Sequence, residues 1–243
     1  MKKIKGLLLK DILQSKSYLF IYIFVYVIFA VVGIFLAISS KSGTEYFNDP
    51  NVSEESLAIG LLQSSILSCI FVFCLSPMYA ASGITLSFQQ DEKWNFDKFA
   101  VASGISRKTI VTEKFCFGLL VTLPSFIVSV IVAIVIAAMN TYSLKYLVVL
   151  YCLLINIGGL LIHSSVALVF NTFLGSVKGR VWLSIATIFG LLLEGGIFYF
   201  YAGVGINNVL YGSLITFGFL LISIGIAIGL YFLSLKAYLN KEF

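Results

Sequence analysis

Two ionisable residues, His163 and Glu194, stand inside long apolar stretches of the sequence. Such groups are costly within a membrane unless they are paired or hydrated, so both are candidates for a translocation pathway that handles a proton or a polar part of a substrate. His163 has a simpler alternative, a neutral imidazole that hydrogen-bonds a neighbouring helix. Glu194 opens the glycine-rich stretch 194–205, which indicates a helix that breaks near the outer surface. We therefore expect its carboxylate to face a water-filled vestibule or a polar partner.

Other residue types that carry chemistry lack the spacing that the chemistry needs. The cysteines show neither CxxC spacing nor a neighbouring histidine, which favours small buried hydrophobes over a metal site; they are Cys69, Cys74, Cys116 and Cys152. No H-E-x-x-H motif occurs, and the acid pair Glu54-Glu55 lies outside the apolar runs. Regularly spaced arginines and filter motifs are also missing. The sequence thus predicts no catalytic residue and no metal, and it disfavours an intramembrane enzyme or a channel.

The amino-acid composition indicates that these residues lie in a membrane rather than in water. Hydrophobic residues make up 60% of the 243 residues and charged residues only 11%, against roughly 45 to 50% and 25% in soluble domains. A membrane-spanning helix needs ~20 mostly apolar residues, and the sequence has six such runs, at about 18–38, 57–80, 115–139, 146–173, 181–202 and 209–235. We predict an all-α polytopic membrane protein in which residues 1–243 form one transmembrane domain. Pro77 should kink the second run or mark where it leaves the bilayer.

The basic residues are distributed unevenly between the two sides that these runs define. Five precede the first run, five lie between the second and third, two between the fourth and fifth, and two after the sixth. The other side holds only Lys41 and Lys145. Because lysine and arginine favour cytoplasmic loops, both termini are expected in the cytoplasm. The acidic segment 45–55 then belongs to the largest external loop.

The amino-terminal segment 1–17 is too charged to span a membrane, yet it has an apolar side. The apolar side chains near one face of a helix would be Ile4, Leu7, Leu8 and Ile12. A helix of this kind lies in the membrane interface. The alternative is a frayed basic tail that only anchors the first run.

The segment 89–114 is the longest cytoplasmic connection, and it is not a simple solvated loop. A helix here would have two apolar faces, one with Trp94, Val101 and Ile105 and the other with Phe96, Phe99 and Ala100. Two apolar faces need two partners, so we expect one to pack on the membrane domain and the other to contact a separate protein. Ser106 is suited to cap the next helix.

Two motifs in these segments resemble the membrane subunits of type-2 ABC transporters, in the small bacterial subgroup whose permease and ATPase are separate chains. The first motif is Lys5-Gly6-Leu7-Leu8-Leu9-Lys10-Asp11, ahead of the first run. The second extends from Asp91-Glu92-Lys93 through Ser106-Arg107-Lys108 to Lys114. The family often has a proline just before the positions that match Ser106 and Arg107, where this sequence has Gly104-Ile105.

The resemblance implies an amino-terminal interfacial elbow helix, six spans, a cytoplasmic coupling helix after the second span, and a re-entrant segment between the fifth and sixth. It also implies a dimer of ABC ATPases beneath two permeases, the second being another copy or a paralogue. The residues expected to couple to the ATPase are Asp91, Glu92, Trp94, Phe96, Asp97, Phe99, Arg107 and Lys108.

No G-x-x-x-x-G-K-[ST] phosphate-binding loop occurs in this sequence, and residues 175–180 contain glycine and lysine without that spacing. ATP and magnesium are therefore expected on the partner ATPase, with no cofactor on this chain and no nucleic acid among its partners. The expected function is that of a permease subunit of an exporter in the bacterial cytoplasmic membrane, which moves an amphipathic peptide or another hydrophobic substrate. An immunity or sensing subunit on the same scaffold is the alternative.

Overall fold

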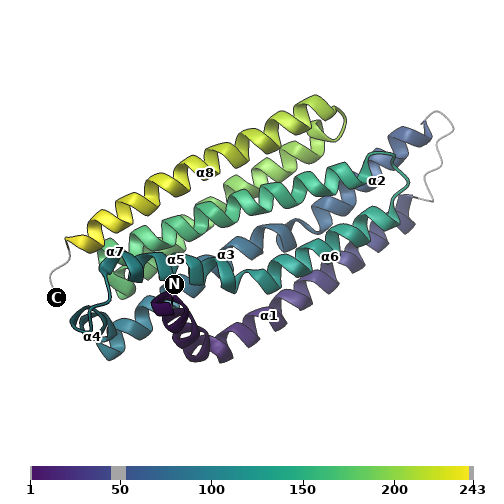
Figure 1. Ribbon diagram of the computed structural model, residues 1–243. Helices are drawn as coiled ribbons and strands as arrows, with labels where there is room; N and C mark the ends of the chain where they lie inside the picture. The colour runs from purple at the N-terminus through teal and green to yellow at the C-terminus, as the bar shows by residue number, and fades with distance from the viewer. Residues whose placement is uncertain (1, 45–52, 241–243) are drawn as a thin grey trace.

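The computed structural model describes residues 2–44 and 53–240, and the regular structure in these ranges is entirely helical. The helices are α1 (Lys2–Thr44), α2 (Glu54–Ser68), α3 (Ile70–Trp94), α4 (Phe96–Ala102), α5 (Arg107–Val121), α6 (Leu123–Met139), α7 (Lys145–Phe200), the π-helical turn η1 (Tyr201–Gly205) and α8 (Val209–Leu239). They form one elongated bundle, in which the start of α1, the end of α8 and α4 share one end (Figure 1). The predicted all-α class is confirmed. Most of the acidic segment 45–55 lies outside the described residues.

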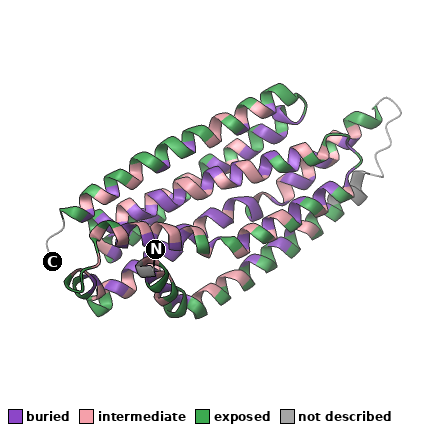
Figure 2. Cartoon of the chain, viewed as in Figure 1, coloured by how far each residue is buried: buried purple, intermediate pink, exposed green. Residues whose placement is uncertain are grey.

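The outside of the bundle is covered by apolar side chains. Exposed residues line the outward faces of the long helices (Figure 2), and they include large hydrophobic side chains such as Phe20 and Phe35. Among the described residues, five helical segments are long and apolar enough to cross a membrane: Ile4–Ser39, Glu54–Trp94, Arg107–Met139, Lys145–Gly205 and Val209–Leu239. The chain is therefore a multi-pass membrane protein.

Helix α7 consists of two arms that fold back on each other at Gly175. The φ of 74° and ψ of 169° at this residue are non-helical, and a positive φ is readily adopted only by glycine. Gly179 lies against the backbone of Phe170, and further along Gly190 lies against the ring of His163, so the arms are antiparallel. The predicted fourth and fifth runs correspond to these two arms.

The helix of the second predicted run is interrupted at Cys69 and not at Pro77, and the kink at Pro77 or exit from the bilayer there stays a prediction. Cys69 separates α2 from α3, whereas α3 continues through Pro77 as far as Trp94. The run is also longer than predicted, because the helix reaches Trp94 instead of ending near residue 80.

A neighbouring helix provides the hydrogen-bond donor that Pro77 cannot provide to the carbonyl of Phe73. Proline has no backbone N–H, so the carbonyl of Phe73, four residues earlier, loses its helical donor. The side-chain amide of Asn156 in α7 donates to it. The adjacent carbonyl of Val72 accepts from the hydroxyl of Tyr26 in α1, which is 2.6 Å from Ser129 Oγ in α6. Four helices meet at this point, which explains why α3 passes through its proline.

The helix that leads into the third predicted run is α5, which begins directly after Ser106 as predicted. The predicted cap is present, because the Thr109 N–H donates to Ser106 Oγ over 3.1 Å. α5 ends at Val121, and α6 begins at Leu123, directly before Pro124. Together the two helices make one long segment, and the predicted loop 89–114 is helical over most of its length.

α1 is helical without interruption from Lys2 to Thr44, although its first turns run at an angle to the rest (Figure 1). The side of these turns that packs on the protein carries Leu7, Asp11 and Ser15, all buried. This stripe is more polar than the predicted apolar face, from which Ile12 is exposed. The amino-terminal segment is therefore held partly by polar contacts.

The carbonyl of Phe73 provides a test of this packing. Replacing Asn156 by Leu removes its donor, and a buried unsatisfied carbonyl costs about 1 to 3 kcal/mol. We expect Asn156→Leu to lower the melting temperature of the purified protein. In a Pro77→Ala background the backbone N–H of residue 77 becomes available, so the same substitution should cost less. Strictly additive effects of the two substitutions would contradict the assignment.

Candidate functional site

A cluster of buried charges joins three helices at the end of the bundle that carries α4. Its centre is Lys114 of α5, which has no exposed surface. The Nζ of Lys114 lies 2.8 Å from Asp11 Oδ2 in α1 and 2.5 Å from Asp91 Oδ2 in α3. Lys10 contacts the same two aspartates, with its Nζ 2.8 Å from Asp11 Oδ1. Glu113 is a third buried carboxylate, 3.8 Å from the Lys114 Nζ.

Each charged side chain of this cluster is neutralised or hydrogen-bonded by the others. The Ser87 hydroxyl donates to Asp11, and Lys114 donates to Ser87. Removing one partner from a buried pair leaves an uncompensated charge and costs about 3 to 5 kcal/mol. Asp11, Asp91 and Lys114 belong to the two motifs that carry the family resemblance, so these distant motifs lie together in space.

The turn between α3 and α4 orients two aromatic side chains outward. Asn95 has the left-handed values φ 51° and ψ 31°, so α4 does not continue the helical phase of α3. Trp94 is 66% exposed and Phe99 is 68% exposed, whereas Ala100 is fully buried. The prediction that Phe99 shares a face with Ala100, opposite Trp94, was wrong. Phe99 and Ala100 are neighbours in α4 that point to different sides, and the turn at Asn95 leaves Phe99 exposed, as Trp94 is.

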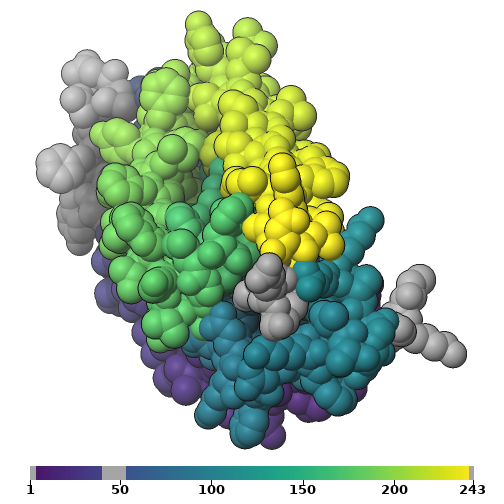
Figure 3. Space-filling model, turned by 90° about the vertical axis from the view of Figure 1, so that its left-hand side faces the viewer, coloured from purple at the N-terminus to yellow at the C-terminus, as the bar shows by residue number. Residues whose placement is uncertain are grey.

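The remaining side of α4 is attached to its own domain. The ammonium group of Lys10 lies 3.8 Å from the centre of the half-buried Phe96 ring. Asp97 is buried and interacts electrostatically with Tyr238 of α8. Close by, Arg107 at the start of α5 donates to the carbonyl of Leu239. Figure 3 looks onto this end, where α4 and its flanking segments (blue to teal) lie beside the end of α8 (yellow).

Glu92 connects α3 to the turn of α7. Its carboxylate accepts from the backbone N–H of Ser176 over 2.9 and 3.2 Å and also from the Ser176 hydroxyl. Among the predicted coupling residues, Asp91, Glu92, Phe96, Asp97 and Arg107 therefore make contacts within the chain. Trp94, Phe99 and Lys108 are exposed.

His163 and Glu194 face each other between the two arms of α7. Their Nε2 and Oε2 atoms are 3.7 Å apart, and both residues are buried. Each side chain lies over a glycine of the opposite arm, Glu194 over Gly159 and His163 over Gly190. Of the two environments predicted for Glu194, the structure shows the polar partner, His163, and not a water-filled vestibule. The helix continues past Gly195-Gly196 to Phe200, so the carboxylate lies inside the hairpin.

The charge cluster contains residues that were not predicted as site residues, namely Lys10, Asp11, Glu113 and Lys114. One signal in the sequence could have identified Lys114, because it shares a helical face with Ile110, Val111 and Phe117, all buried. Over the described ranges, no group of three or more histidine, cysteine or acidic residues could hold a metal ion.

Lys114→Met should strongly destabilise the protein, because it leaves Asp11 and Asp91 buried with Lys10 as their remaining cation. We expect a loss of about 3 to 5 kcal/mol in the free energy of unfolding, measured by thermal or denaturant unfolding of the purified protein. Lys108→Met is the matched control, since Lys108 is an exposed lysine on the same helix. Equal stability of the two variants would contradict a central role for Lys114.

A comparison with protein families shows to which family the chain belongs. A family model described as ABC-2 family transporter protein matches residues 56–238, from α2 to α8. The match includes Asp91 and Lys114 and leaves out α1. No curated protein and no solved structure matches the chain. Because the family match covers most of the sequence, the chain belongs to the ABC-2 transporter permease family and is the membrane subunit of an ABC transporter.

Proposed function

We propose that this protein is the permease subunit of an ABC exporter in the bacterial cytoplasmic membrane. In this proposal it moves an amphipathic peptide or another hydrophobic substrate outward, and a separate ATPase chain supplies the energy. The family match supports a transporter subunit, and the sequence pattern supports a separate ATPase, since no phosphate-binding loop occurs in it. ATP and magnesium would be bound by that partner.

We propose six membrane crossings with both termini in the cytoplasm. The five long apolar helices provide six crossings because α7 reverses at Gly175. The start of α1, the end of α8 and α4 share one end of the bundle (Figure 1). The basic residues around these segments support a cytoplasmic location for that end by the positive-inside rule.

The observation that carries the coupling proposal is the pair of exposed aromatic side chains at α4. Trp94 and Phe99 are about two-thirds exposed, on a segment whose other side is attached to α1 and α8. Exposed aromatic side chains on an anchored element are typical of a protein-binding surface. We propose that α4 is the coupling helix and that the first turns of α1 form the elbow.

The charge cluster would transmit movement from the ATPase to the membrane helices. Asp91 lies one turn before the α3–α4 junction, and its partners Lys114 and Lys10 belong to α5 and α1. A push on α4 would therefore act on three helices at once. The full assembly would contain two ATPases and two permeases, the second permease being another copy or a paralogue.

Removing the two exposed aromatics tests the coupling surface. Truncation of buried interface aromatics often costs ~2 kcal/mol or more, which is a more than tenfold loss in affinity. We expect Trp94→Ala with Phe99→Ala to abolish co-purification of the ATPase while the permease still reaches the membrane. The matched control is Tyr146→Ala with Tyr199→Ala, two aromatics of similar exposure at 66% and 69%, which should leave co-purification unchanged.

Wild-type yield of ATPase with the double variant would overturn this assignment. The ATPase contact would then lie elsewhere, first of all at the turn of α7, where Phe173 and Val177 are exposed.

A second test concerns Glu194, which we propose acts in transport. Glu194→Gln keeps the size of the side chain and removes its charge, so the variant should fold with an unchanged melting temperature. We expect it to alter the ATPase rate of the assembled transporter. If Glu194→Leu also leaves that rate and transport unchanged, Glu194 serves only to pack against Gly159.

A further inference from the structure

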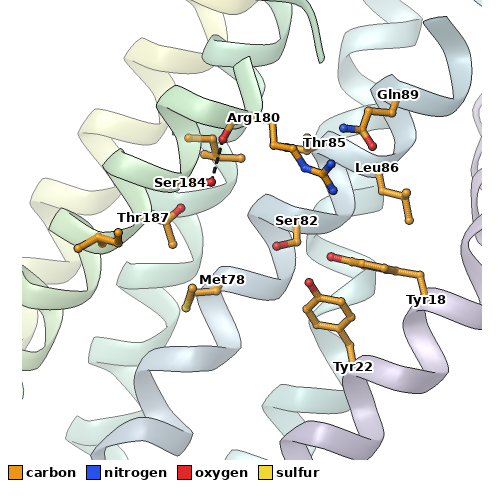
Figure 4. Close-up of a pocket in the computed structure, with 12 residues that line it drawn as sticks. Tyr18, Tyr22, Met78, Ser82, Thr85, Leu86, Gln89, Arg180, Ser184 and Thr187 are labelled. Atoms are coloured by element: carbon orange, nitrogen blue, oxygen red, sulfur yellow. Dashed lines mark hydrogen bonds between the residues drawn. The ribbon is translucent and has the colours of Figure 1, made fainter. Parts of the chain in front are cut away.

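A pocket of about 340 Å³ lies between α1, α3 and the second arm of α7. Its volume is within the range of roughly 300 to 1,000 Å³ that is typical of small-molecule sites. It lies on the cytoplasmic side of Pro77, apart from the His163–Glu194 contact. Figure 4 shows the side chains that line it.

One end of the pocket is polar and positively charged. The guanidinium group of Arg180 extends from α7 toward α3 and lies near the polar atoms of Gln89, Ser82 and Tyr18 (Figure 4). The rings of Tyr18 and Tyr22 lie close together, with centroids 4.0 Å apart and planes tilted by 42°, and both hydroxyls point into the same space. Guanidinium, amide and hydroxyl donors converge here, which is suited to an anionic group.

Within the described chain, no ion pair joins Arg180 to a carboxylate. None of the residues that line the pocket is acidic. Glu92, one turn beyond Gln89 on α3, is held by Ser176 instead. The positive charge of Arg180 is therefore available to a ligand.

The other end of the pocket is more apolar and lies deeper in the membrane domain. It is lined there by Met78 of α3 and by Leu183 and Ile188 of α7. Eight residues separate Arg180 from Ile188, which corresponds to about 12 Å along a helix. Ile188 is 58% exposed on the apolar outside of the bundle, so a chain leaving the pocket here would enter lipid.

We propose that this pocket binds an anionic amphiphile, with its phosphate or carboxylate at Arg180 and the first part of its apolar chain along Met78, Leu183 and Ile188. A polar head near the membrane surface and a chain directed toward the interior is the orientation of a molecule in the inner leaflet. A phospholipid and a single-chain amphiphile share this chemistry. The proposal does not depend on the ATPase contact.

The test is a titration of the purified full-length protein followed by native mass spectrometry. The probes are phosphatidylglycerol against phosphatidylcholine with the same acyl chains, and dodecyl phosphate against dodecylphosphocholine. We expect one anionic molecule to bind at least about tenfold more tightly than its zwitterionic counterpart, the amount that one charged hydrogen bond provides. Preference within the diacyl pair identifies a membrane lipid, and preference within the single-chain pair alone identifies a free amphiphile.

Arg180→Gln should remove this preference, and Arg180→Lys should retain part of it. The matched control is Lys178→Gln, which removes the same charge from an exposed residue that does not line the pocket. If Arg180→Gln does not fold, Ser82→Leu should block binding by filling the pocket without changing the charge. Equal binding of anionic and zwitterionic probes by the wild type, or equal losses in Arg180→Gln and Lys178→Gln, would overturn the proposal. Co-purification of the ATPase should be unaffected by Arg180→Gln, so the two proposals fail independently.

Discussion

A buried ammonium group must be neutralised by its neighbours, and this constraint at Lys114 determines how the charged end of the bundle is assembled. Lys114 is fully buried, and its two aspartate partners come from α1 and α3. Bringing these carboxylates to α5 fixes the direction of the first turns of α1 and the position at which α3 ends. The α3–α4 turn follows Asp91 by one helical turn, so α4 depends on the same contacts.

α3 makes polar contacts with its neighbours at several further points along its length. Near its middle, the carbonyls around Pro77 accept from Tyr26 of α1 and Asn156 of α7. At its end, Glu92 binds the turn of α7. In an apolar surrounding, a backbone carbonyl without a hydrogen-bond donor costs several kcal/mol. These contacts therefore favour one arrangement of helices around α3, whereas apolar packing alone would allow several. The neighbours of α3 are thus defined by hydrogen bonds and ion pairs.

The helical class, the apolar runs and the family could be predicted from the sequence, because apolar length and motif spacing are local properties. The orientation of α4 could not, since a single left-handed residue, Asn95, rotates α4 relative to α3 and leaves Phe99 exposed while Ala100 is buried. The role of Lys114 was also missed, because basic residues near a run are expected at the surface. A hydrated environment was one of the two predicted for Glu194, from the glycines that follow it, but its environment is set by Gly159 on the other arm, which no local pattern reveals.

The facing side chains inside α7 also restrict how the protein can move. His163 and Glu194 each occupy a recess made by a glycine of the opposite arm, so sliding one arm along the other would drive a large side chain into a neighbour that has a Cβ atom. A closely packed interface of this kind behaves as a rigid body. A change of conformation would then tilt the whole hairpin against its main neighbours, α3 and α8. The space beside Arg180 lies at that boundary, and its width would change with every tilt.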